Sequence, residues 1–136
     1  MIMKRILIID DEPHVIRIMR LALETAGYHV DEATNGLQAL EYLRQQHPDA
    51  MITDIDMPRM NGRDLCLEIG ESMPDRKFRI YVLTARAEDE HRVWSATLDN
   101  LEFMEKPVSV RRLVAIMNEY FSANDAGGEQ ACRTAR

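Results

Sequence analysis

The stretch AMITDIDMPRMNG, residues 50–62, joins an apolar run to two aspartates, Asp54 and Asp56, and then to a turn that contains Pro58. The apolar run has no polar face, which is typical of a strand that lies between two layers of helices. Acidic residues at the end of such a strand matter chemically only if other segments place polar groups beside them. The rest of the sequence therefore decides what Asp54 can do.

Short apolar segments alternate with helical patterns along the chain. Residues 6–9 and 80–83 are also apolar on both faces, and weaker strand candidates are Val30 and residues 101–104. Apolar residues at helical spacing predict helices around residues 15–26, 37–43, 65–69, 93–98 and 110–121. Five strand–helix units in succession predict an α/β protein with a parallel sheet and helices on both faces.

Length, charge and cysteine content narrow the classes of protein. A chain of 136 residues suits one domain, and a net charge of −6 argues against a nucleic-acid-binding surface. No apolar run reaches the ~18 residues of a membrane helix, and the N-terminal run is too short for a signal peptide. Cys66 and Cys132 have neither metal-site nor disulfide spacing, which fits a cytoplasmic protein. We expect one domain over residues 1–122 and a flexible tail over residues 123–136, where periodicity is lost.

Polar residues follow four of the predicted strands. They are Asp10 and Asp11 after the first, Asp54 after the third, Thr84 after the fourth, and Glu105, Lys106 and Pro107 after the fifth. Ligands of doubly wound sheets bind beyond these strand ends, so the side chains should share one pocket. Two carboxylates ~5 Å apart repel by roughly 3 kcal/mol at an effective dielectric constant of ~20, which a divalent cation would offset. Oxygen ligands favour Mg²⁺, and a lysine and a hydroxyl beside it predict phosphoryl transfer onto a carboxylate.

Four motifs carry a family resemblance. IIDDE (residues 8–12), TDIDMPRMNG (53–62), LTA (83–85) and EKP (105–107) stand in the order and at the spacing of the receiver domain of two-component response regulators, which the chain resembles over about residues 3–122. The resemblance implies a flavodoxin-like, doubly wound, five-stranded parallel sheet with strand order 2-1-3-4-5 and five helices. It also implies a phosphorylation-activated signalling domain that catalyses only its own phosphorylation and dephosphorylation.

The same resemblance assigns roles to the pocket residues. Asp54 becomes the phosphoacceptor. Asp11 binds Mg²⁺ directly, Asp10 binds it through water, and the backbone carbonyl of Asp56 completes the metal site. Lys106 pairs with the phosphoryl group.

Two further positions are implied to form the switch. Thr84 is the switch hydroxyl, and Phe103 is the aromatic residue that changes rotamer with it. Phe103 lacks the hydroxyl of the tyrosine found in many relatives, so the switch is expected to work by packing alone. Asp99 and Asn100 stand where the family often has Gly-Ala, and Asn100 is expected to adopt the left-handed conformation that ends a helix.

Asp56 and Arg86 each lie two residues beyond a pocket residue, Asp54 and Thr84. We expect both side chains to flank the pocket mouth, where they could pair and control the entry of an anionic donor. The alternative is that both are solvated side chains with no kinetic role. His14, His29, His47 and His91 lack a metal-binding spacing and are predicted to be surface residues, whereas Cys66 is predicted to pack in the interior.

The implied partners are a sensor histidine kinase or a histidine phosphotransfer protein, and an unidentified downstream protein. Neither nucleic acid nor a membrane is expected as a partner, and no DNA-binding helix-turn-helix is expected in this sequence. The downstream surface would be the face formed by residues 93–98, 101–104 and 110–121. A homodimer through this face is left open, because the charged residues typical of DNA-binding relatives are not recognisable there.

Two other functions share some of these sequence features. Asp54-Ile55-Asp56 is similar to the Asp-x-Asp motif of haloacid-dehalogenase-type phosphohydrolases. In those enzymes the acid pair follows the motif, whereas here it precedes it at residues 10 and 11, and the chain is too short for a substrate-covering cap. A receiver that works without phosphorylation is disfavoured because no acidic pocket residue is missing. Chain order and length favour the phosphorylated receiver.

Overall fold

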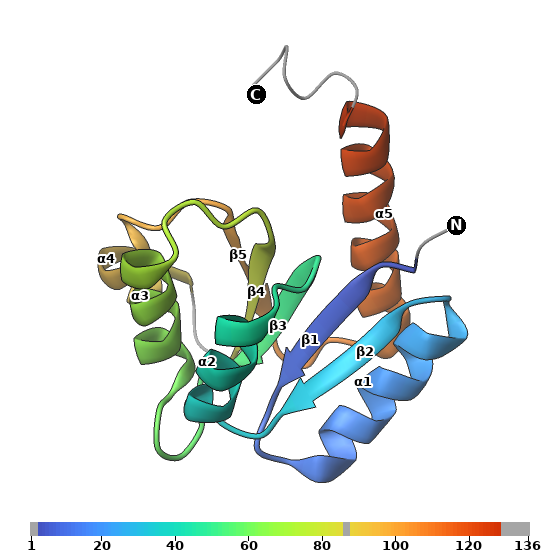
Figure 1. Cartoon of the computed structure of the whole chain (residues 1–136). Helices are drawn as coiled ribbons and strands as arrows, with labels where there is room; N and C mark the ends of the chain where they lie inside the picture. The colour runs from blue at the N-terminus through green and yellow to red at the C-terminus, as the bar shows by residue number, and fades with distance from the viewer. Residues whose placement is uncertain (1–2, 86–87, 129–136) are drawn as a thin grey trace.

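The computed structural model describes residues 3–85 and 88–128, and within them strands alternate with helices (Figure 1). The elements are β1 (Arg5–Ile9), α1 (Pro13–Thr25), β2 (His29–Ala33), α2 (Gly36–Gln45), β3 (Ala50–Asp54), α3 (Gly62–Ser72), β4 (Arg79–Thr84), a 3₁₀ turn η1 (Glu88–His91), α4 (Arg92–Ser95), β5 (Leu101–Glu105) and α5 (Val110–Gly128). All strand pairs are parallel, in the order β2-β1-β3-β4-β5. The predicted flavodoxin-like sheet with order 2-1-3-4-5 is confirmed.

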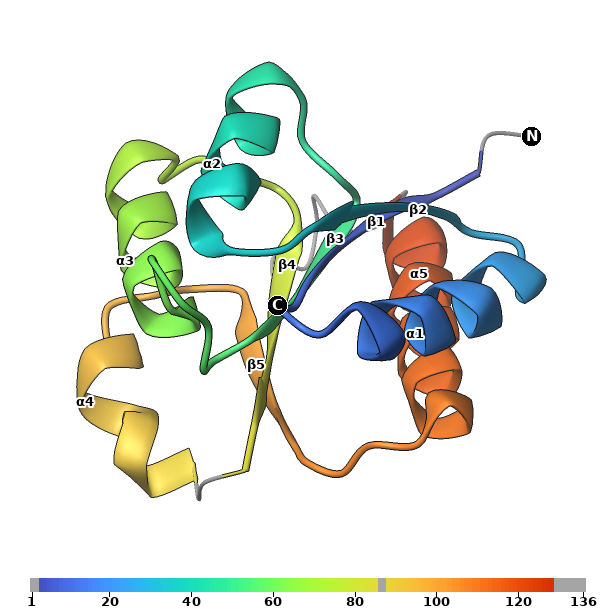
Figure 2. The same cartoon turned by 90° about the horizontal axis from the view of Figure 1, so that it is seen from below.

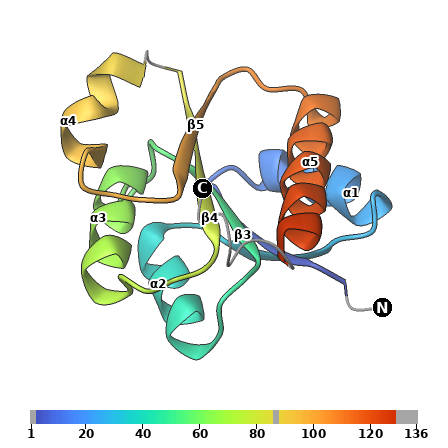
Figure 3. The ribbon, with the colours of Figure 1, turned by 90° about the horizontal axis from the view of Figure 1, so that it is seen from above.

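The sheet separates two layers of helices. Helices α1 and α5 lie against one face, and α2, α3 and α4 lie on the other (Figures 2 and 3). Alternation along β1 supplies both cores: Ile6 and Ile8 pack toward α1 and α5, whereas Leu7 and Ile9 pack toward α2 and α3. Because both faces of the central strands are covered, these strands carry no polar face.

Local signals fix where the helices begin and end. Pro13 begins α1, where its missing N–H has no helical partner to lose. The side chains of Asn35 and Asn61 cap α2 and α3 by accepting backbone N–H groups of the first turn. Gly27 ends the α1 region with φ of 102°, and Asn100 precedes β5 with φ of 56°, which confirms the left-handed conformation expected for Asn100.

Three helices differ from the sequence prediction. The buried stripe of α1 consists of Ile16, Met19 and Leu23, whereas Ile18, one of the apolar residues at helical spacing, is 54% exposed. Helix α4 has only four residues, Arg92–Ser95, and ends three residues before the predicted end at residue 98. Helix α5 continues beyond the predicted end at Ser122 to Gly128, and its last turns stand beyond the sheet (Figure 1).

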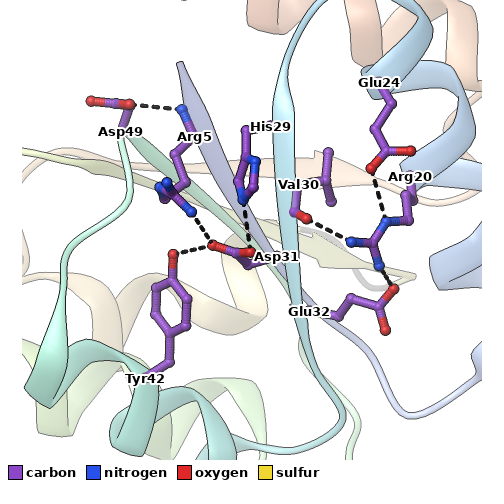
Figure 4. A network of polar contacts seen from close by, with 9 residues as sticks. All are labelled: Arg5, Arg20, Glu24, His29, Val30, Asp31, Glu32, Tyr42 and Asp49. Atoms are coloured by element: carbon purple, nitrogen blue, oxygen red, sulfur yellow. Dashed lines mark hydrogen bonds and ion pairs between the residues drawn. The ribbon is translucent and has the colours of Figure 1, made fainter. Parts of the chain in front are cut away.

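A compact polar network lies on the edge strand β2, at Asp31 (Figure 4). The Asp31 carboxylate accepts hydrogen bonds from Arg5 Nη1 at 2.9 Å and from the Tyr42 hydroxyl, and His29 Nε2 lies 3.0 Å from its other oxygen. Burial raises the pKa of Asp31, but the hydrogen bonds from Tyr42, Arg5 and His29 outweigh it and hold that pKa below its ordinary value. The negative charge of Asp31 is thus compensated within the protein.

None of the helices within the described residues is both long and apolar enough to cross a membrane.

Candidate functional site

The carboxyl ends of the strands bring the predicted pocket residues to one edge of the sheet. Asp54 and Thr84 are the last residues of β3 and β4, whereas Asp10 and Lys106 directly follow β1 and β5. The register pairs Ile9 with Thr53 across β1 and β3, so the next residues, Asp10 and Asp54, lie side by side. Residues far apart in the sequence therefore meet because parallel strands end together.

Three carboxylates form the centre of this site. Asp10, Asp11 and Asp54 each offer an oxygen, and these oxygens lie within 4.8 Å of one another. Asp10 is 3% and Asp54 is 4% exposed, whereas Asp11 is exposed to solvent. Hard oxygen ligands grouped around one point, open on one side, are the donor set that suits Mg²⁺. The residues present therefore fit a divalent cation.

Burial and the repulsion between these carboxylates are both reflected in the pKa of Asp10. Burial, together with the nearby charge of Asp54, raises the pKa of Asp10, although the backbone N–H of Glu12 donates a hydrogen bond to its Oδ1 at 2.9 Å. One hydrogen bond and one nearby ammonium group are not enough to offset the loss of water and the repulsion. The site has excess negative charge that a cation would relieve.

Lys106 provides that ammonium group. Its Nζ lies 2.6 Å from Asp54 Oδ1, and its own side chain is 37% exposed. Burial lowers the pKa of Lys106, but the hydrogen bond and charge of Asp54, helped by Asp10 and Asp56, outweigh burial and raise it. The lysine is consequently positively charged at neutral pH. The backbone N–H of Lys106 donates to the Thr84 carbonyl at 2.8 Å, which ties the end of β4 to the residue that pairs with Asp54.

The loop after β3 is held close to Asp54. The Ile55 N–H donates to Asp54 Oδ1 at 2.9 Å, and the Gly62 N–H donates to the Ile55 carbonyl at 2.8 Å. A Cβ at Gly62 would collide with the backbone carbonyl of Asp54, so only glycine permits this approach. Asp56 follows in the loop with an exposed side chain, at the open side of the site.

His91 corrects one sequence prediction. Expected on the surface, it is only 6% exposed, and its Nε2 lies 2.9 Å from Thr84 Oγ1. Its ring stacks on Phe103 with centroids 5.1 Å apart, and its Nδ1 accepts the indole N–H of Trp94 at 3.1 Å. The sequence signal for this contact is weak, since it consists of a histidine three residues before a tryptophan at the start of a short helix.

The remaining predicted positions are distributed as follows. Phe103 lies on β5, with its side chain partly buried against the core on the α2–α3 side. Cys66 is fully buried, as predicted, and burial raises the pKa of its thiol to about 12. Arg86, expected to flank the pocket mouth with Asp56, lies outside the described residues.

Comparison with known proteins points to one family. The family model for the response regulator receiver domain matches residues 6–118. The response regulator MprA of Mycolicibacterium vanbaalenii is 32% identical over 136 residues, covering 96% of this chain and 57% of that protein. MprA of Mycobacterium ulcerans is 34% identical over 116 residues, covering 83% of this chain and 48% of that protein. The chain thus spans about half the length of these curated relatives.

Solved structures support the same assignment. A CheY-like receiver domain protein from Methanospirillum hungatei superimposes with a TM-score of 0.81 at 26% identity, covering 92% of this chain and 98% of that one. The response regulator TrrA of Thermotoga maritima, solved in complex with Mg²⁺-BeF, has a TM-score of 0.73 at 32% identity, covering 86% of this chain and 98% of that one. The chemotaxis regulator CheY4 of Vibrio cholerae shares the fold, with a TM-score of 0.78 at 23% identity.

Proposed function

The chain belongs to the family of response regulator receiver domains, and on that premise we propose that Asp54 accepts a phosphoryl group from a sensor histidine kinase or a histidine phosphotransfer protein. The observation that carries this proposal is the contact of 2.6 Å between Asp54 Oδ1 and Lys106 Nζ beside the carboxylates of Asp10 and Asp11. A nearly buried carboxylate beside one ammonium group and two further acids is the arrangement expected of an aspartate that receives a phosphoryl group.

The transfer is a displacement at phosphorus. A carboxylate oxygen of Asp54 forms the new P–O bond while the P–N bond of the donor phosphohistidine breaks, and the electron pair of that bond returns to the imidazole of the donor. Hydrolysis restores the free carboxylate: water attacks the phosphorus, the acyl phosphate P–O bond breaks with its electron pair on the Asp54 oxygen, and inorganic phosphate leaves with the protons of the water or passes them to solvent. In both steps negative charge develops close to Lys106. This lysine pairs with a phosphoryl oxygen once the Asp54 carboxylate has been phosphorylated.

The carboxylates of Asp10, Asp11 and Asp54, with the backbone carbonyl of Asp56, would hold Mg²⁺. When bound, the ion supplies the positive charge that lets an anionic donor approach an acidic pocket. The raised pKa of Asp10 supports this assignment, because it reflects negative charge that the residues of the site leave uncompensated. Thr84, at the end of the neighbouring strand, donates a hydrogen bond from its hydroxyl to the phosphoryl group. This contact changes the surface formed by α4, β5 and α5, where a downstream protein binds.

The test uses acetyl phosphate as donor and intact-protein mass spectrometry as readout. The wild type should gain one phosphoryl group in the presence of Mg²⁺ and none in the presence of a chelator. Asp54→Asn should gain none under either condition. Asp64→Asn, which changes an exposed aspartate on α3, is the matched control and should be labelled like the wild type. Undiminished label on Asp54→Asn would refute the phosphoacceptor assignment.

A further inference from the structure

Thr84 contacts one member of a cluster of three aromatic rings. We call this cluster, which consists of His91, Trp94 and Phe103, the ring cluster. His91 and Phe103 stack with an interplanar angle of 14°, and the Trp94 indole meets both rings edge-on, with centroids 5.8 Å from each. The cluster joins the end of η1, helix α4 and strand β5. Its polar link to the site is the contact of 2.9 Å between His91 Nε2 and Thr84 Oγ1, and Thr84 is 1% exposed.

Chemistry assigns the direction of each hydrogen bond. An indole N–H can only donate, so His91 Nδ1, which lies 3.1 Å from Trp94 Nε1, must present a lone pair. The neutral ring then carries its proton on Nε2, and this N–H donates to Thr84 Oγ1. A threonine hydroxyl can accept one hydrogen bond while it donates its own proton in another. The bond from His91 therefore does not prevent the Thr84 hydroxyl from donating to a phosphoryl oxygen.

The contact between His91 and Thr84 is important because of the residue type at position 103. Phe103 has no polar atom in its side chain, so it can follow Thr84 only through packing or through an intermediate residue. His91 is placed as that intermediate: its edge bonds Thr84, and its face stacks on Phe103. Its other nitrogen holds Trp94 of α4, so a displacement of the Thr84 hydroxyl reaches both β5 and α4 through one side chain.

We propose that His91 is the positioning residue that transmits the response of Thr84 to α4 and Phe103. The inference rests on the proposed phosphorylation of Asp54 and deepens it, since it names the residue through which the switch hydroxyl acts on the surface. When the Thr84 hydroxyl turns toward a phosphoryl group on Asp54, the imidazole follows it, and the stack with Phe103 and the bond to Trp94 change together. A polar contact thus supplements the packing expected from Phe103 alone.

Trp94 provides the measurement, because it is the single tryptophan of the chain. Acetyl phosphate and Mg²⁺ are added to the full chain, and indole emission is followed beside the mass-spectrometric label. In the wild type, emission should change with the same time course as the label. Asp54→Asn should give neither label nor emission change. A wild type that takes no label would overturn the proposed function, and this inference with it.

Two variants separate the hydrogen bond from ring packing. His91→Phe keeps a ring against Phe103 but has neither the N–H that bonds Thr84 nor the nitrogen that accepts the Trp94 indole, so it should accept the label and lose the emission change. His91→Gln has an amide N–H in place of Nε2–H and should recover part of that change. Circular dichroism verifies that both variants are folded. A labelled His91→Phe with the full wild-type emission change would overturn the inference while leaving the proposed function intact.

A measurement on the unsubstituted protein covers the case in which a variant fails to fold. The ¹⁵N chemical shifts of the histidine rings distinguish the two neutral tautomers, and the His91 ring is assigned in the wild type by the proximity of its protons to the rings of Trp94 and Phe103. We expect the tautomer protonated at Nε2 before labelling, with the Nε2 shift moving on addition of acetyl phosphate. A ring protonated at Nδ1, or an Nε2 shift that labelling leaves unchanged, would overturn the inference.

Discussion

Two groups of acidic residues in this protein show opposite solutions to the burial of negative charge. At the edge strand β2, Asp31 is bonded by Arg5, Tyr42 and His29, and its pKa is lowered (Figure 4). At the carboxyl ends of the strands, Asp10 lies near Asp54, and its pKa is raised. In the first group, the negative charge of Asp31 is compensated without any ligand. The second keeps an excess of negative charge that a divalent cation would offset, and this difference separates a structural ion pair from a candidate site.

The largest effect is expected when Asp11, the exposed acid of the site, loses its carboxylate. Asp11→Ala should abolish Mg²⁺-dependent labelling by acetyl phosphate at ordinary Mg²⁺ concentrations, with an affinity for Mg²⁺ at least about tenfold lower, or ~1.4 kcal/mol. The labelling rate as a function of Mg²⁺ concentration measures this. Asp31→Asn is the control and should keep the wild-type Mg²⁺ dependence. An Asp11→Ala protein with unchanged dependence would remove Asp11 from the metal site.

Neutralising the compensated acid should destabilise the fold. Asp31→Asn deprives Arg5 of its charged partner and weakens the bond from Tyr42, so the free energy of unfolding should fall by about 1–3 kcal/mol. Urea unfolding in the absence of Mg²⁺ provides the value. Tyr42→Phe, which removes one hydroxyl from the same carboxylate, should cost less, about 1 kcal/mol. A stability equal to the wild type for Asp31→Asn would show that this network contributes nothing.

Neutralising an acid of the site should have the opposite sign. Asp10→Asn keeps an amide oxygen that can accept the Glu12 N–H, but it removes one charge from the repulsive group. The free energy of unfolding without Mg²⁺ should rise by about 1 kcal/mol. Added Mg²⁺ should stabilise the wild type more than Asp10→Asn, since a ligand that binds the folded state stabilises it. A destabilised Asp10→Asn protein would mean that Asp10 is compensated after all.

The pH dependence distinguishes the two acids in the wild-type background. Asp31 has a lowered pKa, so its stabilising contribution is present above the unfolded value of about 3.9 and is lost as pH falls through the folded pKa. Asp10 has a raised pKa, so its charge lowers stability as pH rises through that pKa. In chelator-containing buffer, the gain in Asp10→Asn should therefore shrink between pH 7 and about 4, whereas the loss in Asp31→Asn should persist until below about pH 4. Parallel urea titrations across this range would show both trends, and a gain in Asp10→Asn independent of pH would contradict the first.

The smallest effect is expected at the mouth of the site. Asp56 is exposed, and its charge acts on Lys106, so Asp56→Asn should speed labelling by acetyl phosphate. An exposed charge is worth only ~0.2–1 kcal/mol, which limits the gain to severalfold. High salt should reduce it, since screening weakens exposed charges. Stopped-flow rates at two ionic strengths decide the matter: equal rates for both proteins at low salt would show that Asp56 is only a solvated side chain.

Sequence reasoning correctly located the polar residues at the ends of the buried strands. The apolar runs of β1, β3 and β4 are unambiguous, and once they are parallel, Asp10, Asp54 and Thr84 must share an edge. It was weaker where helices decide burial. On α1, Ile18 and Leu21 are apolar but exposed, so hydrophobicity alone does not identify the packed face. His91 was missed because its burial depends on how η1 and α4 settle against Phe103, twelve positions further on, a tertiary contact that no local pattern encodes.

The brevity of α4 has a consequence for how the protein can change. A helix of four residues forms few backbone hydrogen bonds of its own, and within Arg92–Ser95 no side chain is fully buried. Val93 projects into solvent at 89% exposure. Such a segment opens at a much lower free energy than the sheet beneath it, and its amides should exchange with solvent deuterium long before those of β1 or β3. The surface next to Thr84 can consequently be remade by local unfolding and refolding while the strands that carry the carboxylates stay intact.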